Sequence, residues 1–273
     1  MQAVVQERYG TADSLALEEI DHPEVGDNAV LVRVRAAAVN PADWHFMRGD
    51  PYLMRLQAGL RRPKTRVLGC DLAGQVEAVG KEVTALRPGD QVFGCTFMRG
   101  FGAFAERAPV SEDVLAPKPA DLSFEHAAAV PTAALTALQG LRDHGGIEAG
   151  HRVLVVGASG GVGTFAVQIA KASGAEVTGV CSSRNVDLVR SLGRWIGPVG
   201  RTIAATLLSP FASQRLLGFT VKPNSDDLLH LRQLLEKGSV KPVIDRSYPI
   251  GEVPMAIRYL EEGHARGKVV ITV

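Results

Sequence analysis

The sequence predicts an α/β protein with two domains, one rich in β-strands and one with alternating strands and helices. Three observations lead to this fold class. Short β-branched runs separated by Pro, Gly and Asp turns fill the first third of the chain. From Ser123 onward, helical and strand patterns alternate, which is typical of a parallel sheet flanked by helices. A length of 273 residues is enough for two modest domains with cores of their own.

The β-rich domain is predicted from three strand-like segments and from the last residues of the chain. The three segments alternate in polarity or are rich in β-branched residues, and they are 29–35, 74–79 and 90–93. The run 268–273 has the same character, and we expect it to return to this domain. We therefore predict that residues 1–122 and 246–273 form one domain and that residues 123–245 form the other.

The second domain contains a strand, a glycine turn and a helix in direct succession. An apolar strand at 153–156 precedes the turn, and an apolar face at Phe165, Ile169 and Ala172 follows with helical spacing. A second strand, 176–181, comes at the distance that a βαβ unit requires. This context makes the glycine turn a candidate dinucleotide site.

Each glycine of the turn has its own expected role. Gly157 permits the tight bend, Gly160 lets the backbone approach a pyrophosphate, and Gly163 lets the new helix pack closely on the strand. The free N–H groups at the helix N-terminus then attract the anion. A strand–turn–helix packed tightly for structural reasons alone is the alternative interpretation. The residues expected to bind the cofactor here are Gly157, Ser159, Gly160, Gly161, Val162 and Gly163.

The end of the second strand indicates which dinucleotide is bound. An NAD site places an acidic side chain there, whereas an NADP site avoids the acid and supplies hydroxyls and a cation. This chain has Ser182 and Arg184 in the loop, and its first acid is Asp187. We therefore expect NADPH, with Ser182 and Arg184 on the 2′-phosphate. A solvated Ser–Arg loop is the alternative.

Composition limits the partners. A formal net charge of +1 provides no field for nucleic acid or an anionic membrane, and the basic patch 61–64 is too short to change that expectation. The N-terminal residues lack the apolar core of a signal peptide, and the most apolar helical candidate, 127–141, is too short to span a bilayer. Three scattered cysteines suit a reducing compartment. We expect a cytoplasmic protein.

Five segments occur in an order that resembles the medium-chain dehydrogenase/reductase superfamily. They are 39–44, 69–76, 87–94, 129–137 and 157–163. The match is closest to the zinc-free quinone oxidoreductase (zeta-crystallin-like) branch. This resemblance implies a GroES-like catalytic domain joined to a Rossmann domain, usually as a homodimer. It also implies that NADPH reduces a quinone, an enone or a related carbonyl.

The resemblance also predicts that the protein uses no metal. Zinc alcohol dehydrogenases of the superfamily have a Cys where this chain has Asn40, and a His–Glu pair where it has Cys70 and Asp71. The four closely spaced cysteines of their structural zinc site are absent from the sequence as well. Cys70 together with histidines is the alternative, because a catalytic zinc needs three converging protein ligands. We expect Cys70 to be a small buried residue instead.

Without a metal, negative charge that develops on a substrate oxygen needs hydrogen-bond donors. By resemblance, Asn40 and Asp43 match the active-site turn of the superfamily, and His45 and Tyr52 fall near positions that face the substrate cleft. Thr136 matches a residue placed near the nicotinamide. Structural alternatives exist for each: a capped turn for Asn40 and Asp43, packing for His45 and Tyr52, and a hydroxyl bonded to its own helix for Thr136.

Part of the second domain is missing relative to the superfamily. After Gly193 the chain continues at once with residues similar to those beyond the missing part. At about 30 residues per βαβ unit the gap is on the order of 60 residues, and its loss would leave strand 153–156 with an open edge. A non-catalytic nucleotide-binding or structural protein is therefore the alternative function. Residues 211–222 lie where relatives place an edge strand that pairs across a two-fold axis, so we expect a homodimer.

Overall fold

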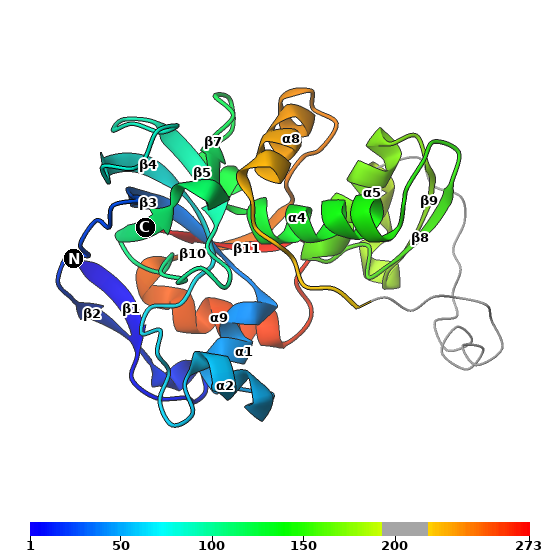
Figure 1. The fold of residues 1–273 in the computed structure, drawn as a ribbon. Coiled ribbons are helices and arrows are strands. Elements are labelled where there is room, and N and C mark those ends of the chain that lie inside the picture. Colours follow the sequence, from blue (N-terminus) through cyan, green and yellow to red (C-terminus); the bar gives the residue numbers. More distant parts are fainter. Residues whose placement is uncertain (193–217) are drawn as a thin grey trace.

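The computed structural model describes residues 1–192 and 218–273. Its largest sheet has seven strands, with β10, β11, β3, β4, β5 and β7 in spatial order and β6 paired with β3 (Figure 1). A separate hairpin joins β1 to β2. The strands of this β-rich part are β1 Gln2–Gln6, β2 Leu15–Glu19, β3 Ala29–Val39, β4 Asp71–Val79, β5 Gln91–Cys95, β6 Arg107–Ser111, β7 Leu115–Pro117, β10 Ile244–Pro249 and β11 Lys268–Thr272.

The predicted return of the C-terminus to the β-rich sheet is confirmed. Strand β11 runs antiparallel to β3, with Val269 opposite Val39, and parallel to β10. Strand β3 is long enough to pair with β11 through its last residues and with β6 through its first. Its apolar side chains pack against those of neighbouring strands in a core that also holds Met47 and Phe104.

The strand–turn–helix prediction is also confirmed. Strand β8 (Arg152–Val156) leads through the glycine turn into α5 (Gly161–Ala172), and β9 (Glu176–Val180) then pairs parallel with β8. Phe165 and Ile169 are buried as expected, whereas Ala172 is exposed because it lies at the helix end. Among the described residues β8 has no hydrogen-bonded strand other than β9. Leu154 and Val156, which share one face of β8, are 60% and 63% exposed.

The remaining helices connect and cover the two sheets. The apolar segment 127–141 forms two helices rather than one, because Pro131 begins a new helix at its first turn. Helix α8 starts at an Asn224 cap, whose side chain accepts from the Asp227 N–H. These helices are α1 Pro41–Arg48, α2 Arg55–Ala58, α3 Phe124–Ala128, α4 Pro131–Gln139, α6 Val186–Ser191, α8 Ser225–Glu236 and α9 Val253–Glu261.

Two sequence predictions fall wholly or partly outside the described residues. The junction after Gly193 lies outside them, as does the first part of the proposed dimer strand 211–222. The described part, 218–222, forms no strand within the single chain, and its pairing with a second copy stays a prediction. No helix in the described part of the chain is both long and apolar enough to cross a membrane.

One apolar cluster joins the β-rich sheet to helices α4, α5 and α8. It contains Ala36 of β3, Phe93 of β5, Leu135 of α4, Phe165 of α5 and Leu231 of α8, all buried. Helix α4 lies between the β-rich sheet and α5 in Figure 1. The glycine turn is therefore held in a fixed position relative to the ends of β3 and β11.

Candidate active site

A cleft of about 530 Å³ separates the glycine turn from the β-rich sheet. One wall is the turn itself, from Gly157 to Val162. The opposite wall comes from the end of β3 and the start of α1, with Asn40 and Trp44. Lys268, at the start of β11, completes the lining between them. The turn therefore opens onto a space that both domains share.

The backbone of the turn requires glycine at two positions. Gly157 has φ of +74°, a left-handed conformation that is costly for other residues. A Cβ on Gly163 would lie 2.1 Å from the carbonyl oxygen of Gly157, so α5 packs on the turn with no room for a side chain. These are the roles that the sequence assigned to the two glycines. Gly160 and Gly161 line the cleft, where the N-terminus of α5 begins.

The loop after β9 is tied to the glycine turn by one buried hydrogen bond. The side-chain nitrogen of Asn185 donates to Ser159 Oγ over 3.0 Å, and both residues are buried. Ser159 thus contributes to the shape of the site from behind the turn. Ser182 and Arg184 are exposed at the tip of the same loop, where a 2′-phosphate could approach them.

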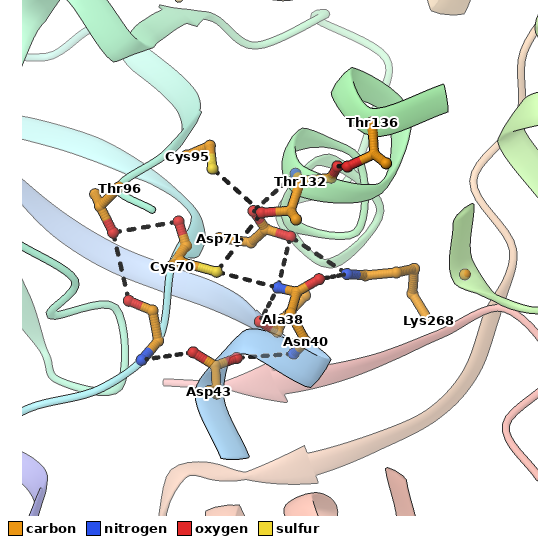
Figure 2. Close-up of polar contacts among 12 residues, drawn as sticks. Ala38, Asn40, Asp43, Cys70, Asp71, Cys95, Thr96, Thr132, Thr136 and Lys268 are labelled. Carbon is orange, nitrogen blue, oxygen red and sulfur yellow. Dashed lines mark hydrogen bonds and ion pairs between the residues drawn. The ribbon is translucent and has the colours of Figure 1, made fainter. Parts of the chain in front are cut away.

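A polar network lies where several strands of the β-rich sheet end (Figure 2). Since β3 is antiparallel to both β4 and β11, the end of β3 meets the starts of the other two. Asn40, Asp71 and Lys268 occupy those three positions. Thr132, in the first turn of α4, approaches them from the other domain.

Asp71 is the centre of this network. Its Oδ1 accepts from the backbone N–H and the hydroxyl of Thr132, over 2.9 and 2.6 Å. Its Oδ2 accepts from the Asn40 amide over 3.0 Å and forms an ion pair of 3.3 Å with Lys268. Lys268 also donates to the Asn40 side-chain oxygen. Asp71 is fully buried and Lys268 is 4% exposed, so water screens the pair poorly.

Asp43 holds the start of α1 in place. Its carboxylate accepts from the backbone N–H of Asn40 over 2.7 Å and from that of Gly69 over 3.1 Å. The pKa of Asp43 is raised from 3.8 to about 7, chiefly by complete burial and also by the charge of Asp71, although these two hydrogen bonds and the charge of Lys268 lower it. Asp43 does not line the cleft. This geometry favours the capped-turn interpretation for Asp43.

The comparisons with known proteins agree with this architecture. Residues 26–120 match the family described as "Alcohol dehydrogenase GroES-like domain", and residues 176–271 match the one described as "Zinc-binding dehydrogenase". A 2-methylene-furan-3-one reductase of Solanum lycopersicum is 33% identical over 96% of this chain and 76% of its own. The chain belongs to the medium-chain dehydrogenase/reductase superfamily of oxidoreductases.

Other members of the superfamily extend the comparison. An NADPH-dependent alkenal/one oxidoreductase of Arabidopsis thaliana is 33% identical over 99% of this chain and 79% of its own. The solved structure of a quinone oxidoreductase from Coxiella burnetii superposes with a TM-score of 0.86 at 28% identity, covering 100% of this chain and 99% of that one.

The lengths of the alignments agree with a shortened second domain. A chloroplastic quinone oxidoreductase of Triphysaria versicolor, 28% identical, aligns over 327 positions that cover 99% of this chain and 98% of the relative. This chain has 273 residues, so at least 54 of those positions have no counterpart in it. That difference is close to the gap of about 60 residues predicted for the second domain.

The side chains of the described residues do not fit a zinc ion, the metal named in the description of the second matching family. Within residues 1–192 and 218–273, no three His, Cys, Asp or Glu side chains are grouped so that they could hold a metal ion. A hydrogen bond with Cys95, burial, and the charges of Asp43 and Asp71 raise the pKa of Cys70 well above its ordinary value. Zinc requires a thiolate, which this environment opposes. The Cys70 and Cys95 sulfurs lie 3.6 and 3.2 Å from Thr132 Oγ1.

Three further predicted site residues lie outside the cleft lining. His45 bonds through Nδ1 to the carbonyl oxygen of Asp50 over 2.9 Å, and Tyr52 is 76% exposed beside Arg55. The Thr136 hydroxyl donates to the Thr132 carbonyl over 2.7 Å, as in the alternative interpretation of that residue. The structure brings Asn40 and the glycine turn together, and it places these three elsewhere.

Lys268 and Thr132 are site residues that the sequence analysis missed. Lys268 precedes an apolar strand directly, a position where a lysine is usually solvent-exposed. Thr132 was visible only as a helix residue beside a proline. The one available signal was Asp71, an acid between Cys70 and the apolar residues Leu72 and Ala73, which implies a buried partner. Trp44 also lines the cleft, and its ring stacks on His45 with centroids 3.7 Å apart.

Proposed function

We propose that this chain is a zinc-independent, NADPH-dependent oxidoreductase that reduces a quinone, an enone or a small carbonyl compound. The observation that supports this most directly is the glycine turn, which opens onto a cleft shared with the polar network of the β-rich domain. Relatives named for alkenal/one and quinone reduction support the substrate class. A shortened relative without catalysis is the second candidate, because β8 has a single described neighbour.

When bound, NADPH supplies a hydride to the substrate. The residues of this chain bind and orient it. Gly161 and Val162, at the start of α5, line the cleft, and the free N–H groups of this helix N-terminus attract the pyrophosphate through their partial positive charge. Ser182 and Arg184 bind the 2′-phosphate. The hydrogen bond between Asn185 and Ser159 holds the loop that carries them against the glycine turn.

Negative charge on the substrate oxygen is stabilised from the β-rich wall. Both polar ends of the Asn40 amide are engaged within the network, so Asn40 positions Asp71 and Lys268 rather than reaching the substrate itself. The Lys268 ammonium has three donors, of which Asn40 and Asp71 use two. Lys268 lines the cleft, and its third donor and its charge are available to a polar group bound there.

Equilibrium titration with NADPH and NADH, followed by calorimetry, tests the cofactor. We expect micromolar NADPH affinity and weaker NADH binding. Arg184→Ala should weaken NADPH binding about tenfold, a loss typical of one charge-assisted contact, and should leave NADH affinity unchanged. Arg190→Ala removes another exposed cation of the same region and serves as the control. Equal losses for both cofactors in Arg184→Ala would refute the 2′-phosphate assignment.

Turnover assays separate the two candidate functions. NADPH oxidation in the presence of a quinone or an alkenal supports the oxidoreductase, whereas NADPH binding without turnover of either class supports the non-catalytic relative. Zinc independence predicts activity that withstands chelation and purified protein without stoichiometric zinc. One tightly bound zinc per chain, with chelator-sensitive activity, would contradict it.

We also propose that the protein is a cytoplasmic homodimer. Light scattering coupled to size-exclusion chromatography tests the dimer, for which twice the chain mass of 29.0 kDa is expected. Cell fractionation of tagged protein tests the location. The domain boundaries at 122 and 245 stay predictions, and limited proteolysis near them is the direct test.

A further inference from the structure

A short helical loop, residues 51–66, presents four large apolar side chains to solvent. Tyr52, Leu53, Leu56 and Leu60 are 76%, 74%, 63% and 69% exposed. They fall within nine consecutive residues, whereas the other exposed large apolar residues described occur singly or in pairs along the chain. Such a concentration of exposed apolar surface is unusual for a soluble protein and typical of a docking site.

The same loop is strongly basic. Between Asp50 and Asp71 the sequence contains five cations and no acidic residue, although the net charge of the whole chain is only +1. Arg61, Arg62 and Lys64 are positioned directly after the apolar residues, and none of the three has an ion-pair partner among the described residues. The cations therefore keep their full charge toward solvent beside the apolar surface.

The loop is held in this arrangement by contacts with the rest of the domain. Arg55 donates to the carbonyl oxygens of Gly49 and Arg48 over 2.9 and 3.2 Å, and its guanidinium lies over the rings of Tyr9 and Tyr52. The Tyr9 hydroxyl donates to the carbonyl of Gly59 over 2.6 Å. The leucines thus point outward from an anchored backbone.

The cleft does not account for this surface. None of residues 51–66 lines the cleft. In Figure 1, α2 lies at the lower edge of the molecule and α8 at the upper edge. The basic run 61–64 alone is too short to indicate a partner. The structure adds the exposed apolar side chains that precede it.

We propose that the loop 51–66 docks the protein on an anionic lipid bilayer. Apolar side chains inserted at the headgroup boundary, flanked by cations that attract acidic headgroups, are the combination that binds a membrane surface reversibly. The absence of acidic residues in the loop removes the repulsion that would oppose this contact. Docking is peripheral, and it is independent of the proposed reaction because neither cofactor nor substrate takes part in it.

Co-sedimentation with vesicles tests the proposal. The full chain is mixed with vesicles of phosphatidylcholine alone or of phosphatidylcholine with phosphatidylglycerol. We expect binding to the anionic vesicles only, and release in 1 M salt, where charges are screened within about 3 Å. Arg61→Gln/Arg62→Gln should weaken binding about fivefold for each cation removed. Leu53→Ser/Leu56→Ser should weaken it at least about tenfold.

Matched variants on other surfaces are the controls. Lys237→Gln/Lys241→Gln removes two exposed cations near α8, and Leu17→Ser/Met255→Ser removes two other exposed apolar residues. Both controls should bind as the wild type does, and the thermal stability of all four variants should be unchanged. Equal losses in loop and control variants would overturn the proposal. Failure of the wild type to prefer anionic vesicles would also overturn it, and would leave an acidic protein as the partner to seek.

Discussion

At the scale of single residues, the most consequential feature is the buried pair of Lys268 and Asp71. Removing water from two charges is costly, and the pair is stable only because Asn40 and Thr132 complete its hydrogen bonds. The pair also joins residues 197 positions apart in sequence. It therefore fixes the start of β11 against the start of β4, beside the cleft.

Lys268→Met should lower the free energy of unfolding by about 3–5 kcal/mol, because it leaves Asp71 charged and buried without a cation. Lys268→Met/Asp71→Asn removes both charges and should recover more than half of that loss. Urea denaturation measures both. Arg232→Met breaks the exposed ion pair with Glu236 and is the control, with an expected cost below about 1 kcal/mol. A loss below about 1 kcal/mol for Lys268→Met as well would show that the pair does not stabilise the fold.

Asp43 predicts a pH dependence of stability. Its pKa of about 7 in the folded state exceeds its ordinary value of 3.8, so the folded state binds more protons than the unfolded state between those values. The free energy of unfolding contributed by Asp43 therefore falls as pH rises from about 4 to 7. Denaturation of wild type and Asp43→Asn at pH 5 to 8 checks this. The stability advantage of the wild type should shrink with pH, and a constant advantage would contradict the raised pKa.

At the scale of elements, the glycine turn joins the strand, the helix and the candidate cofactor site in one local unit. Gly163→Ala should cost about 3 kcal/mol of stability, since its Cβ would meet the Gly157 carbonyl, and it should also weaken NADPH binding. Gly26→Ala, whose Cβ would make only an ordinary contact at 3.8 Å, is the control. An unchanged NADPH affinity in Gly163→Ala would show that the packing of the turn does not matter for binding.

The sequence predicts elements whose determinants are local, and the site only in part. The turn 157–163 and its flanking strand and helix lie within about twenty consecutive residues, so the sequence pattern predicts them. The polar network around Asp71 cannot be predicted in this way, because Asn40 and Lys268 are 228 positions apart in the sequence. His45 and Tyr52 were placed near the cleft by resemblance, but the side-chain directions that separate them from Trp44 depend on packing that a motif does not specify.

At the scale of the whole molecule, the shortened parallel sheet exposes apolar surface on β8. Within residues 1–192 and 218–273, β8 pairs along one edge only, and this edge together with the exposed Leu154 is prone to self-association. Leu154→Lys should therefore reduce light scattering at high protein concentration, while changing the free energy of unfolding by less than about 0.5 kcal/mol. Ala172→Lys adds the same charge at an exposed site of α5 and separates a local effect from one of net charge. Equal reductions of light scattering in both variants would mean that self-association does not occur through β8.

The apolar cluster that spans β3, α4, α5 and α8 has a consequence for cooperativity. Two strands and one crossover helix are too few to stay folded in isolation. Here Phe165 and Ile169 of α5 are embedded among side chains of the β-rich sheet and of α4. The described parallel sheet therefore draws part of its stability from the β-rich domain through α5, and we expect the two parts to unfold together in a single transition. The packing of the glycine turn therefore depends on the contacts of α5 with the β-rich domain, and not on the parallel strands alone.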